Sequence, residues 1–366
     1  MPSITFVTPG FSNHAVGGYK VVYEYANYLA SMGHKVTIAQ LRPAQYRESG
    51  SLSKRLLRAL QYRIGRYRRP SWYALDPRIV VLNYPVQREQ AIPETDVIVA
   101  TAMETAHFSA SVAQERGIPG AYFIQHYEDW GFGPDAVDDT WRLPLQNIVI
   151  APWLLEKGNQ LGVQSVLVAN AIDPVAFPSG PQISERPLQV LAMASGMAWK
   201  RTDLISEIMA TLSDTVPEVS LKVFGAIARP SSLPSSVDYI QNPSSSELRI
   251  LYQQSRVFIC ASDTEGFGLP PAEAMSSRSA VVSTDIGGVR SYADGIALFS
   301  PVGDAKDLTK KVIGLLANEA DCEERASAGL DRMRAYLPND AGAAFEAGLL
   351  SLMAPGNRSA KGKTTH

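Results

Sequence analysis

The hydrophobic positions of this chain fall into short runs separated by longer amphipathic segments. The apolar runs are each about four to seven residues long, and segments of about twelve residues with one apolar face lie between them. This alternation is typical of a parallel sheet flanked by helices. The runs predict strands at residues 4–8, 35–40, 79–84, 97–102, 121–125, 147–151, 165–169, 188–194, 220–224, 237–240, 257–261, 280–283 and 296–299.

The clearest helix is expected over residues 18–31, after the first predicted strand. Val21, Tyr25 and Leu29 recur at helical spacing and form one apolar face. Gly33 follows, and a glycine there can adopt the left-handed conformation that ends a helix. The N-terminal region therefore begins with a strand, a loop and a helix that leads to a second strand.

A proline-rich segment at 173–187 interrupts the alternation, which then restarts. The 366 residues are enough for two domains of ordinary size. We therefore expect an α/β domain over 1–172, a linker at 173–187 and a second α/β domain over 188–337. We expect residues 338–354 to form a helix that crosses back to the first domain, and residues 355–366 to form a disordered tail.

Composition and charge exclude several classes of protein. Hydrophobic residues make up 45% of the chain and charged residues 19%, which is the composition of a globular protein. The net charge is -2, so the chain lacks the global charge of a dedicated nucleic-acid-binding protein. Cys260 and Cys322 lie in no metal-binding pattern. No signal peptide or membrane-spanning run is recognised, and we expect a cytoplasmic protein.

Residues 262–275, Ser-Asp-Thr-Glu-Gly-Phe-Gly-Leu-Pro-Pro-Ala-Glu-Ala-Met, connect a predicted strand to a helix and carry the most informative chemistry. Gly266 and Gly268 are expected to leave the loop backbone uncovered, so that a ligand can approach its N–H groups. Pro270 and Pro271 suit a first helical turn, where free N–H groups and the positive end of the helix dipole face the loop. Such a corner accepts an anion or a polyol.

Two carboxylates bracket this corner. Glu265 is expected in the loop and Glu273 in the first helical turn, and each could accept paired hydrogen bonds from neighbouring hydroxyls. A glutamate in a first turn also commonly offsets the helix dipole, so Glu273 by itself leaves both interpretations open.

Glu-Gly-Phe-Gly-x-Pro-x-x-Glu at 265–273 resembles the Glu-x7-Glu motif of retaining glycosyltransferase family four. Further segments resemble that family at 9–40, 170–173, 285–288 and 301–304. The resemblance implies the GT-B fold, with two doubly wound, Rossmann-like domains that face a cleft. It also implies that the N-terminal domain binds an acceptor and the C-terminal domain binds a nucleoside diphosphate sugar.

The resemblance also implies roles for individual residues. Glu273 would contact the nucleotide ribose, and Glu265 would contact hydroxyls of the donor sugar. Lys200 and Arg201 are the best cations for the departing diphosphate, although a lysine and an arginine at a helix start are more often solvated. The expected donor-binding residues are Gly17, Gly18, Lys200, Arg201, Gly266, Phe267, Gly268, Leu269 and Glu273.

The chain departs from the family's pattern at Ser195, Arg278 and Ser291, the last of which stands where the family often has a glutamate. Ser195 stands where the family usually has an arginine, and Arg201 is a candidate to supply that charge. Arg278 stands where the family commonly has a glycine.

On the acceptor side, His126 ends a predicted strand, and the family places a histidine there near the reacting sugar. An isolated histidine at a strand end is otherwise more often structural. Glu128 and Asp129 follow and could orient an acceptor hydroxyl. The run 122–128 is similar to the acceptor-side strand of some family members. Within it, 125–128 resembles members that act on bacterial surface polysaccharides, rhamnosyl transfer among them. The expected catalytic residues are therefore His126, Glu265, Lys200 and Arg201.

The segment 54–69 carries seven positive charges and no acidic residue, with leucines interleaved. It could lie on an anionic membrane surface or reach a lipid-linked acceptor. A solvated loop whose leucines pack on the domain is an equally good interpretation.

These observations predict a retaining glycosyltransferase that needs no metal ion or cofactor. Its partners would be a nucleoside diphosphate sugar and a glycan, lipid-linked or small-molecule acceptor, with no nucleic acid, in the cytoplasm or at the inner face of the membrane. A sugar-nucleotide epimerase and a catalytically inactive sugar-nucleotide-binding scaffold are the alternatives. A dehydrogenase is disfavoured because no Gly-x-Gly-x-x-Gly follows a predicted strand.

Overall fold

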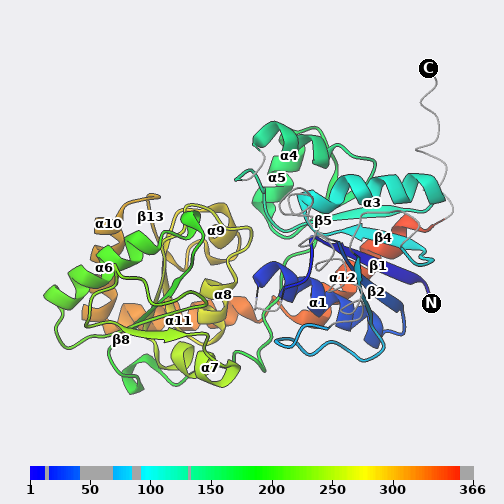
Figure 1. Ribbon diagram of the computed structural model, residues 1–366. Helices are drawn as coiled ribbons and strands as arrows, with labels where there is room; N and C mark the ends of the chain where they lie inside the picture. The colour runs from blue at the N-terminus through cyan, green and yellow to red at the C-terminus, as the bar shows by residue number, and fades with distance from the viewer. Residues whose placement is uncertain (13–15, 42–68, 85–91, 131–132, 355–366) are drawn as a thin grey trace, which may run out of the picture. The chain divides into compact units, whose positions relative to one another are not determined.

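The computed structural model describes residues 1–12, 16–41, 69–84, 92–130 and 133–354. The chain divides into two compact units (Figure 1). Unit 1 comprises Met1–Ala169 and Asn339–His366, and unit 2 comprises Asn170–Pro338. Each unit is built around a parallel sheet with helices on its faces, so the predicted α/β architecture is confirmed.

The sheet of unit 1 has the strand order β3-β2-β1-β4-β5-β6-β7, and every described pair in it is parallel. The order reverses between β1 and β4, as it does in doubly wound folds. The strands are β1 (Ser3–Thr8), β2 (Lys35–Leu41), β3 (Val80–Tyr84), β4 (Val97–Ala100), β5 (Gly120–Ile124), β6 (Gln146–Val149) and β7 (Ser165–Leu167).

Unit 2 has the strand order β10-β9-β8-β11-β12-β13, again with parallel pairs. The order reverses between β8 and β11, so this sheet has the arrangement of a dinucleotide-binding domain. The strands are β8 (Gln189–Ala194), β9 (Ser220–Gly225), β10 (Asp238–Gln241), β11 (Val257–Cys260), β12 (Ala280–Thr284) and β13 (Leu298–Ser300). All strands predicted from the sequence are present, with ends displaced by one or two residues.

Helices cover both faces of each sheet. In unit 1, α3 lies on one face, and α1 and α12 lie on the other (Figure 1). In unit 2, α6 and α10 pack against one face, and α8 packs against the sheet with α7 beside it. The helices are α1 (Gly17–Ser31), α3 (Met103–Arg116), α4 (Pro134–Trp141), α5 (Pro152–Gln160), α6 (Thr202–Thr215), α7 (Ser245–Gln254), α8 (Leu269–Ser276), α9 (Gly287–Ala293), α10 (Ala305–Ala317), α11 (Glu319–Met333) and α12 (Pro338–Leu352).

The helix expected at 18–31 is α1, which begins one residue earlier, at Gly17. Its apolar residues are buried, because Val21, Tyr25 and Leu29 project from the same face of the helix. Gly33 has a φ of +90°, the left-handed conformation that the sequence predicts just after this helix.

Helix α12 packs on unit 1 through an aromatic cluster. The ring of Phe345 is fully buried and stacks on Tyr25, with centroids 4.4 Å apart, and on Phe6 at 5.9 Å. A Cβ on Gly342 would lie 2.4 Å from the ring of Tyr28, so only a glycine fits there. The C-terminal helix is therefore part of the core of unit 1.

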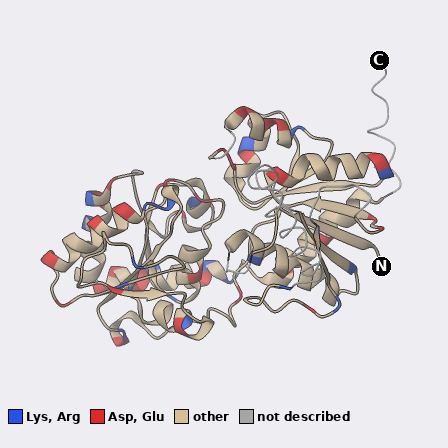
Figure 2. Cartoon of the chain, in the orientation of Figure 1, with Lys and Arg blue, Asp and Glu red and all other residues tan. Residues whose placement is uncertain are grey.

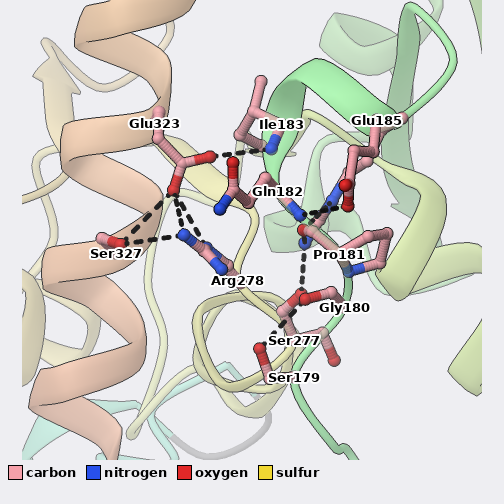
Figure 3. A network of polar contacts seen from close by, with 11 residues as sticks. Ser179, Gly180, Pro181, Gln182, Ile183, Glu185, Ser277, Arg278, Glu323 and Ser327 are labelled. Carbon is pink, nitrogen blue, oxygen red and sulfur yellow. Dashed lines mark hydrogen bonds and ion pairs between the residues drawn. The ribbon is translucent and has the colours of Figure 1, made fainter.

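The segment expected as a linker, 173–187, belongs to unit 2 and is packed into it. Ile183 is fully buried, and its N–H donates to Glu323 Oε2 at 2.7 Å (Figure 3). The guanidinium of Arg186 is buried and donates to the carbonyls of Pro181, Ser255 and Ser277. Burial lowers the pKa of Arg186 to about 10. These bonds fix the connecting segment at the edge of unit 2.

Charged residues of both signs are interspersed over the helices of each unit (Figure 2). Among the described helices, none is long and apolar enough to cross a membrane. Within the basic segment 54–69, only Arg69 is described, and it donates to the carbonyls of Leu75, Asp76 and Ile79. The predictions for the rest of that segment and for the tail at 355–366 lie outside the described residues.

Replacing Phe345 with alanine should lower the unfolding free energy of unit 1 by about 3–5 kcal/mol, because the change leaves a cavity among stacked rings. Denaturant titration followed by far-UV circular dichroism measures the loss. Leu350→Ala, on the same helix but 39% exposed, is the matched control and should have little effect. Equal losses in both variants would contradict the packing role of Phe345.

Candidate functional site

The predicted donor-side residues of unit 2 lie where the strand order of its sheet reverses. Lys200 follows β8 and Glu265 follows β11, and these two strands are neighbours in the sheet. In open parallel sheets, the carboxyl ends of strands at such a reversal form the crevice that binds ligands. The fold therefore places both residues at the position where a ligand is expected.

Lys200 and Glu265 form a close ion pair. Lys200 Nζ lies 2.5 Å from Glu265 Oε1 and 2.6 Å from Oε2, and the side chains are 19% and 9% exposed. Ser262 Oγ donates to Glu265 Oε1 at 2.7 Å. The carboxylate is thus held by charge-assisted bonds in a site largely shielded from water.

The loop that carries Glu265 is fastened to its neighbours through backbone contacts. Asp263 N–H donates to the carbonyl of Trp199 at 2.7 Å, which joins it to the loop of Lys200. A Cβ on Gly288, in α9, would lie 2.4 Å from the carbonyl oxygen of Glu265. Only a glycine permits this approach, so the start of α9 determines where the loop of Glu265 lies.

Arg201 has a φ of +50° and caps the start of α6. Its guanidinium pairs with Asp203 at 2.9 Å and with Asp263 at 3.0 Å. The hydrogen bonds that Arg201 donates to these two carboxylates raise its pKa above the usual value. Ser195, where the family has an arginine, donates its N–H to Thr202 Oγ1 and so closes the loop after β8.

Glu273 is buried in α8, and its Oε2 accepts a hydrogen bond from the hydroxyl of Tyr252 at 3.0 Å. Its expected place in the first helical turn was wrong. The helix begins at Leu269 and contains Pro270 and Pro271 in its first turn, so Glu273 begins the second. The reason is that Gly268, with a φ of +88°, is the N-cap residue.

Gly266, Phe267 and Gly268 are buried, so the expectation that the glycines leave this backbone uncovered was wrong. A Cβ on Gly268 would lie 3.0 Å from Val289 and 3.2 Å from the hydroxyl of Tyr292. That hydroxyl donates to the carbonyl of Gly268 at 2.7 Å. Gly268 is therefore required by its positive φ and by close packing on α9.

The ring of Phe267 packs on Tyr292, with centroids 4.7 Å apart, and on Tyr336 at 6.0 Å. Burial raises the pKa of Tyr292 well above its usual value, and nearby Cys260, Glu265 and Glu273 add to the shift. Both predicted carboxylates thus lie near this buried hydroxyl.

Arg278 has a φ of +60°, the conformation that favours the glycine found there in the family. Its guanidinium donates two hydrogen bonds to Glu323 Oε1, at 2.6 and 2.9 Å (Figure 3). This ion pair links the end of α8 to α11 and offsets part of the cost of the left-handed backbone. The departure from the family's pattern is therefore structural.

The remaining predicted residues lie in unit 1. Gly17 and Gly18 begin α1, and the carbonyl of Gly18 accepts a hydrogen bond from Gln125 Nε2 at 3.1 Å. His126 follows β5, and its Nδ1 lies 3.0 Å from the carbonyl of Tyr127. Because a carbonyl only accepts, the proton of a neutral His126 is on Nδ1. The start of α1 and the end of β5 thus lie together.

Glu128 Oε2 accepts the N–H of Met103, the first residue of α3, at 2.6 Å. Desolvation raises the pKa of Glu128 to about 7; the bond from Met103 opposes the rise, and the charge of Glu104 adds to it. Asp129 is exposed. Glu128 therefore changes charge near neutral pH and is positioned by a helix N-terminus.

Sequence reasoning did not identify Ser262, Tyr252, Tyr292 or the role of Gly288. Ser262 lies three residues before Glu265 in the same loop, so its position could have been noticed. The contact of Tyr252 with Glu273 joins two helices and has no local sequence signal. In the part of the chain that the structure describes, no cluster of three or more His, Cys, Asp or Glu residues is placed to hold a metal ion.

Residues 177–331 match the family model described as glycosyl transferases group 1. That range includes Lys200, Glu265 and Glu273, and most of unit 2.

Two curated relatives match parts of the chain. Alpha-maltose-1-phosphate synthase of Mycobacterium tuberculosis is 33% identical over 141 residues, which is 36% of each chain. O-antigen chain mannosyltransferase RfbU of Salmonella typhimurium is 41% identical over 54 residues, or 15% of each chain. The matched regions thus span about a third or less of these relatives.

Solved structures match nearly the whole chain. Sucrose-phosphate synthase of Thermosynechococcus elongatus has a TM-score of 0.75 at 16% identity and covers 96% of this chain and 98% of its own. Anabaena Alr3699/HepE, in complex with UDP-glucose, has a TM-score of 0.73 at 14% identity and covers 96% and 100%. Residues 177–331 are therefore similar to group 1 glycosyltransferases, and the fold of the chain is the GT-B fold.

Gly288→Ala should destabilise unit 2 by about 1–3 kcal/mol, because its methyl group would collide with the backbone of Glu265. Gly314→Ala is the matched control: it lies in α10 with nothing near its Cβ and should be neutral or slightly stabilising. Denaturant titration of both variants measures the difference. An unchanged midpoint for Gly288→Ala would show that the loop of Glu265 does not depend on this contact.

The stability of unit 1 should fall as pH rises from about 5 to about 8. The folded pKa of Glu128 is about 7, above its usual value, so the folded state binds its proton more tightly, and that advantage is lost as the carboxyl ionises. Glu128→Gln should reduce this fall, whereas Asp129→Asn, on the adjacent exposed residue, should not. The measurement is the unfolding midpoint at several pH values.

Proposed function

We propose that this chain is a retaining glycosyltransferase that moves a sugar from a nucleoside diphosphate sugar to a hydroxyl of a glycan, lipid-linked or small-molecule acceptor. The observation that carries the proposal is the shielded Lys200–Glu265 pair at the strand-order reversal of unit 2. It lies inside the region that matches the glycosyl transferases group 1 family.

In this reaction, the bond between the anomeric carbon and a phosphate oxygen breaks, and the acceptor oxygen forms a bond to the same carbon. The acceptor proton passes to the leaving diphosphate on the same face of the sugar. The transition state places positive charge on the sugar and negative charge on the diphosphate, so groups that stabilise both should accelerate the step.

Lys200 is the proposed partner of the diphosphate. An ammonium carries three N–H donors, so Lys200 can hold Glu265 and donate to a phosphate oxygen at the same time. Glu265 is the proposed acceptor of hydrogen bonds from the donor sugar, and its negative charge would stabilise the cationic sugar. Arg201, already bound to two carboxylates, would contribute mainly by placing Asp263 and the two loops.

Glu273 is the proposed partner of the ribose hydroxyls. Tyr252 donates to one of its oxygens and fixes the direction of the carboxylate from the buried side. Gly266, Phe267, Gly268 and Leu269 are proposed to line this corner, and Phe267 and Gly268 pack on α9.

In unit 1, His126, Glu128 and Asp129 are the proposed acceptor-side residues, and the N–H groups of Gly17 and Gly18 are proposed to bind a donor phosphate. The first three residues follow β5, and the two glycines begin α1. Both positions are at the carboxyl edge of a parallel sheet, where ligands of open α/β folds bind.

The similarity to an alpha-maltose-1-phosphate synthase and an O-antigen chain mannosyltransferase favours a role in bacterial polysaccharide or glycoconjugate synthesis, with rhamnosyl transfer among the candidates. UDP is the first nucleotide to test, because one similar structure is a complex with UDP-glucose. We also propose that no divalent ion is needed and that the enzyme works at the inner face of the membrane, with 54–69 as its contact.

Glu273→Gln should weaken nucleotide binding about 10- to 150-fold, the equivalent of losing about 1.5–3 kcal/mol in hydrogen bonding to a charged group. Glu265→Gln should chiefly lower turnover. Isothermal titration with UDP, GDP and dTDP, followed by hydrolysis assays with their sugars, separates the two effects. Glu319→Gln, a half-exposed carboxylate on α11, is the matched control and should change neither.

The assays are run in excess EDTA, because activity that disappears and returns with manganese would contradict a metal-independent reaction. Conversion of the nucleotide sugar without an acceptor into an isomer would instead indicate an epimerase. Nucleotide binding without turnover on any donor would favour an inactive scaffold.

A further inference from the structure

Three aromatic rings gather at the carboxyl edge of the sheet of unit 1. His126 follows β5, Trp130 lies four residues further on, and Trp153 is in the first turn of α5, directly after β6. The ring centroid of His126 is 4.8 Å from that of Trp130 and 5.8 Å from that of Trp153, both in edge-to-face geometry. Neither tryptophan was expected to be functional.

The rings are held in place but not buried. Trp130 is 48% exposed, although tryptophan usually lies largely inside a protein, and His126 and Trp153 are partly exposed. The contact of His126 Nδ1 with the carbonyl of Tyr127 fixes the orientation of the imidazole. An aromatic surface therefore remains accessible at the edge of the sheet where ligands bind.

Polar groups beside these rings accept hydrogen bonds. Glu128 is anchored on the first N–H of α3, and Asp129 is exposed between Glu128 and Trp130 in the sequence. The stretch 128–141 contains five acidic residues and no lysine or arginine. Lys157, which reaches this region, lies 3.9 Å from Asp138 and 4.4 Å from the ring centroid of Tyr127.

This combination favours one ligand class. A pyranose offers a face of C–H groups, which packs on the electron-rich face of an indole, and hydroxyls, which donate to carboxylates. A phosphate or an anionic lipid surface would be repelled by the acidic stretch. The charge of the patch therefore fits a neutral sugar ring better than a lipid headgroup.

We propose that Trp130 and Trp153, with His126 between them, form a platform that binds a neutral sugar ring of the acceptor. Glu128 and Asp129 accept hydrogen bonds from the hydroxyls of that ring. The proposal deepens the proposed function, on which it rests, and it defines the acceptor as a saccharide, free or as the outermost residue of a larger molecule.

Three substitutions at Trp130 separate an aromatic platform from a merely apolar one. Trp130→Phe keeps an aromatic face, Trp130→Leu keeps apolar area without one, and Trp130→Ala removes both. The probes are methyl α-mannoside, methyl α-glucoside, methyl α-rhamnoside and maltose, with binding to the full chain measured by saturation-transfer NMR and titration. We expect Leu and Ala to weaken binding about three- to tenfold and Phe to retain most of it. Trp153→Leu should act in the same direction.

Nucleotide binding is measured on the same variants and should be unchanged, because Trp130 and Trp153 are not among the proposed donor-binding residues. Wild-type affinity in Trp130→Leu, or no binding of any of the four probes, would overturn the platform. Sedimentation with phosphatidylglycerol vesicles that depends on Trp130 while sugar binding does not would overturn it in favour of a membrane contact.

The two proposals can fail separately. If donor hydrolysis depends on Glu265 but acceptor KM does not depend on Trp130, the platform is wrong and the glycosyltransferase stands. If sugar binding depends on Trp130 but no nucleotide binds, the proposed function is wrong.

Discussion

A lysine and a glutamate shielded from water constrain the whole of unit 2. Lys200 and Glu265 come from different loops, and either charge alone would be costly in so shielded a place. Their pairing therefore requires β8 and β11 to be neighbours, the two loops to be joined at Trp199 and Asp263, and the first turn of α9 to contain a residue as small as Gly288. The parallel sheet is the framework that satisfies these conditions.

The two units use the same arrangement for different surfaces. Both sheets reverse strand order in the middle, and in both the predicted site residues lie on loops that follow the strands. In unit 2 that edge is glycine-rich, contains paired charges and packs closely on α8 and α9. In unit 1 the edge is aromatic and acidic, and Trp130 remains largely accessible. One fold thus supports a glycine-rich edge with paired charges in one unit and an aromatic, acidic edge in the other.

The sequence predicted the strands well because strands buried on both faces are continuous apolar runs. It also placed Lys200, Glu265 and His126 correctly at strand ends, since loop positions follow directly from strand positions. Prediction from the sequence failed where the position or contacts of a residue depend on packing between distant segments. Helix α8 starts at Leu269 because Gly268 adopts a positive φ, a property of the folded loop, and this moved Glu273 out of the first turn.

Tyr252 illustrates the same limit. Nothing near it in the sequence distinguishes it from an ordinary core residue, and its bond to Glu273 exists only because α7 and α8 pack together. Arg278 shows the converse: its departure from the family's glycine was visible in the sequence, but its ion pair with Glu323 was not.

The return of α12 to unit 1 makes that unit discontinuous in the sequence. A fragment that ends at Ala169 would expose the ring faces of Tyr25, Phe6 and Phe123, against which Phe345 stacks or packs edge-on. Separate expression of unit 1 therefore requires the C-terminal helix to be grafted after Ala169 through a short loop, whereas unit 2 is one uninterrupted stretch that can be excised directly.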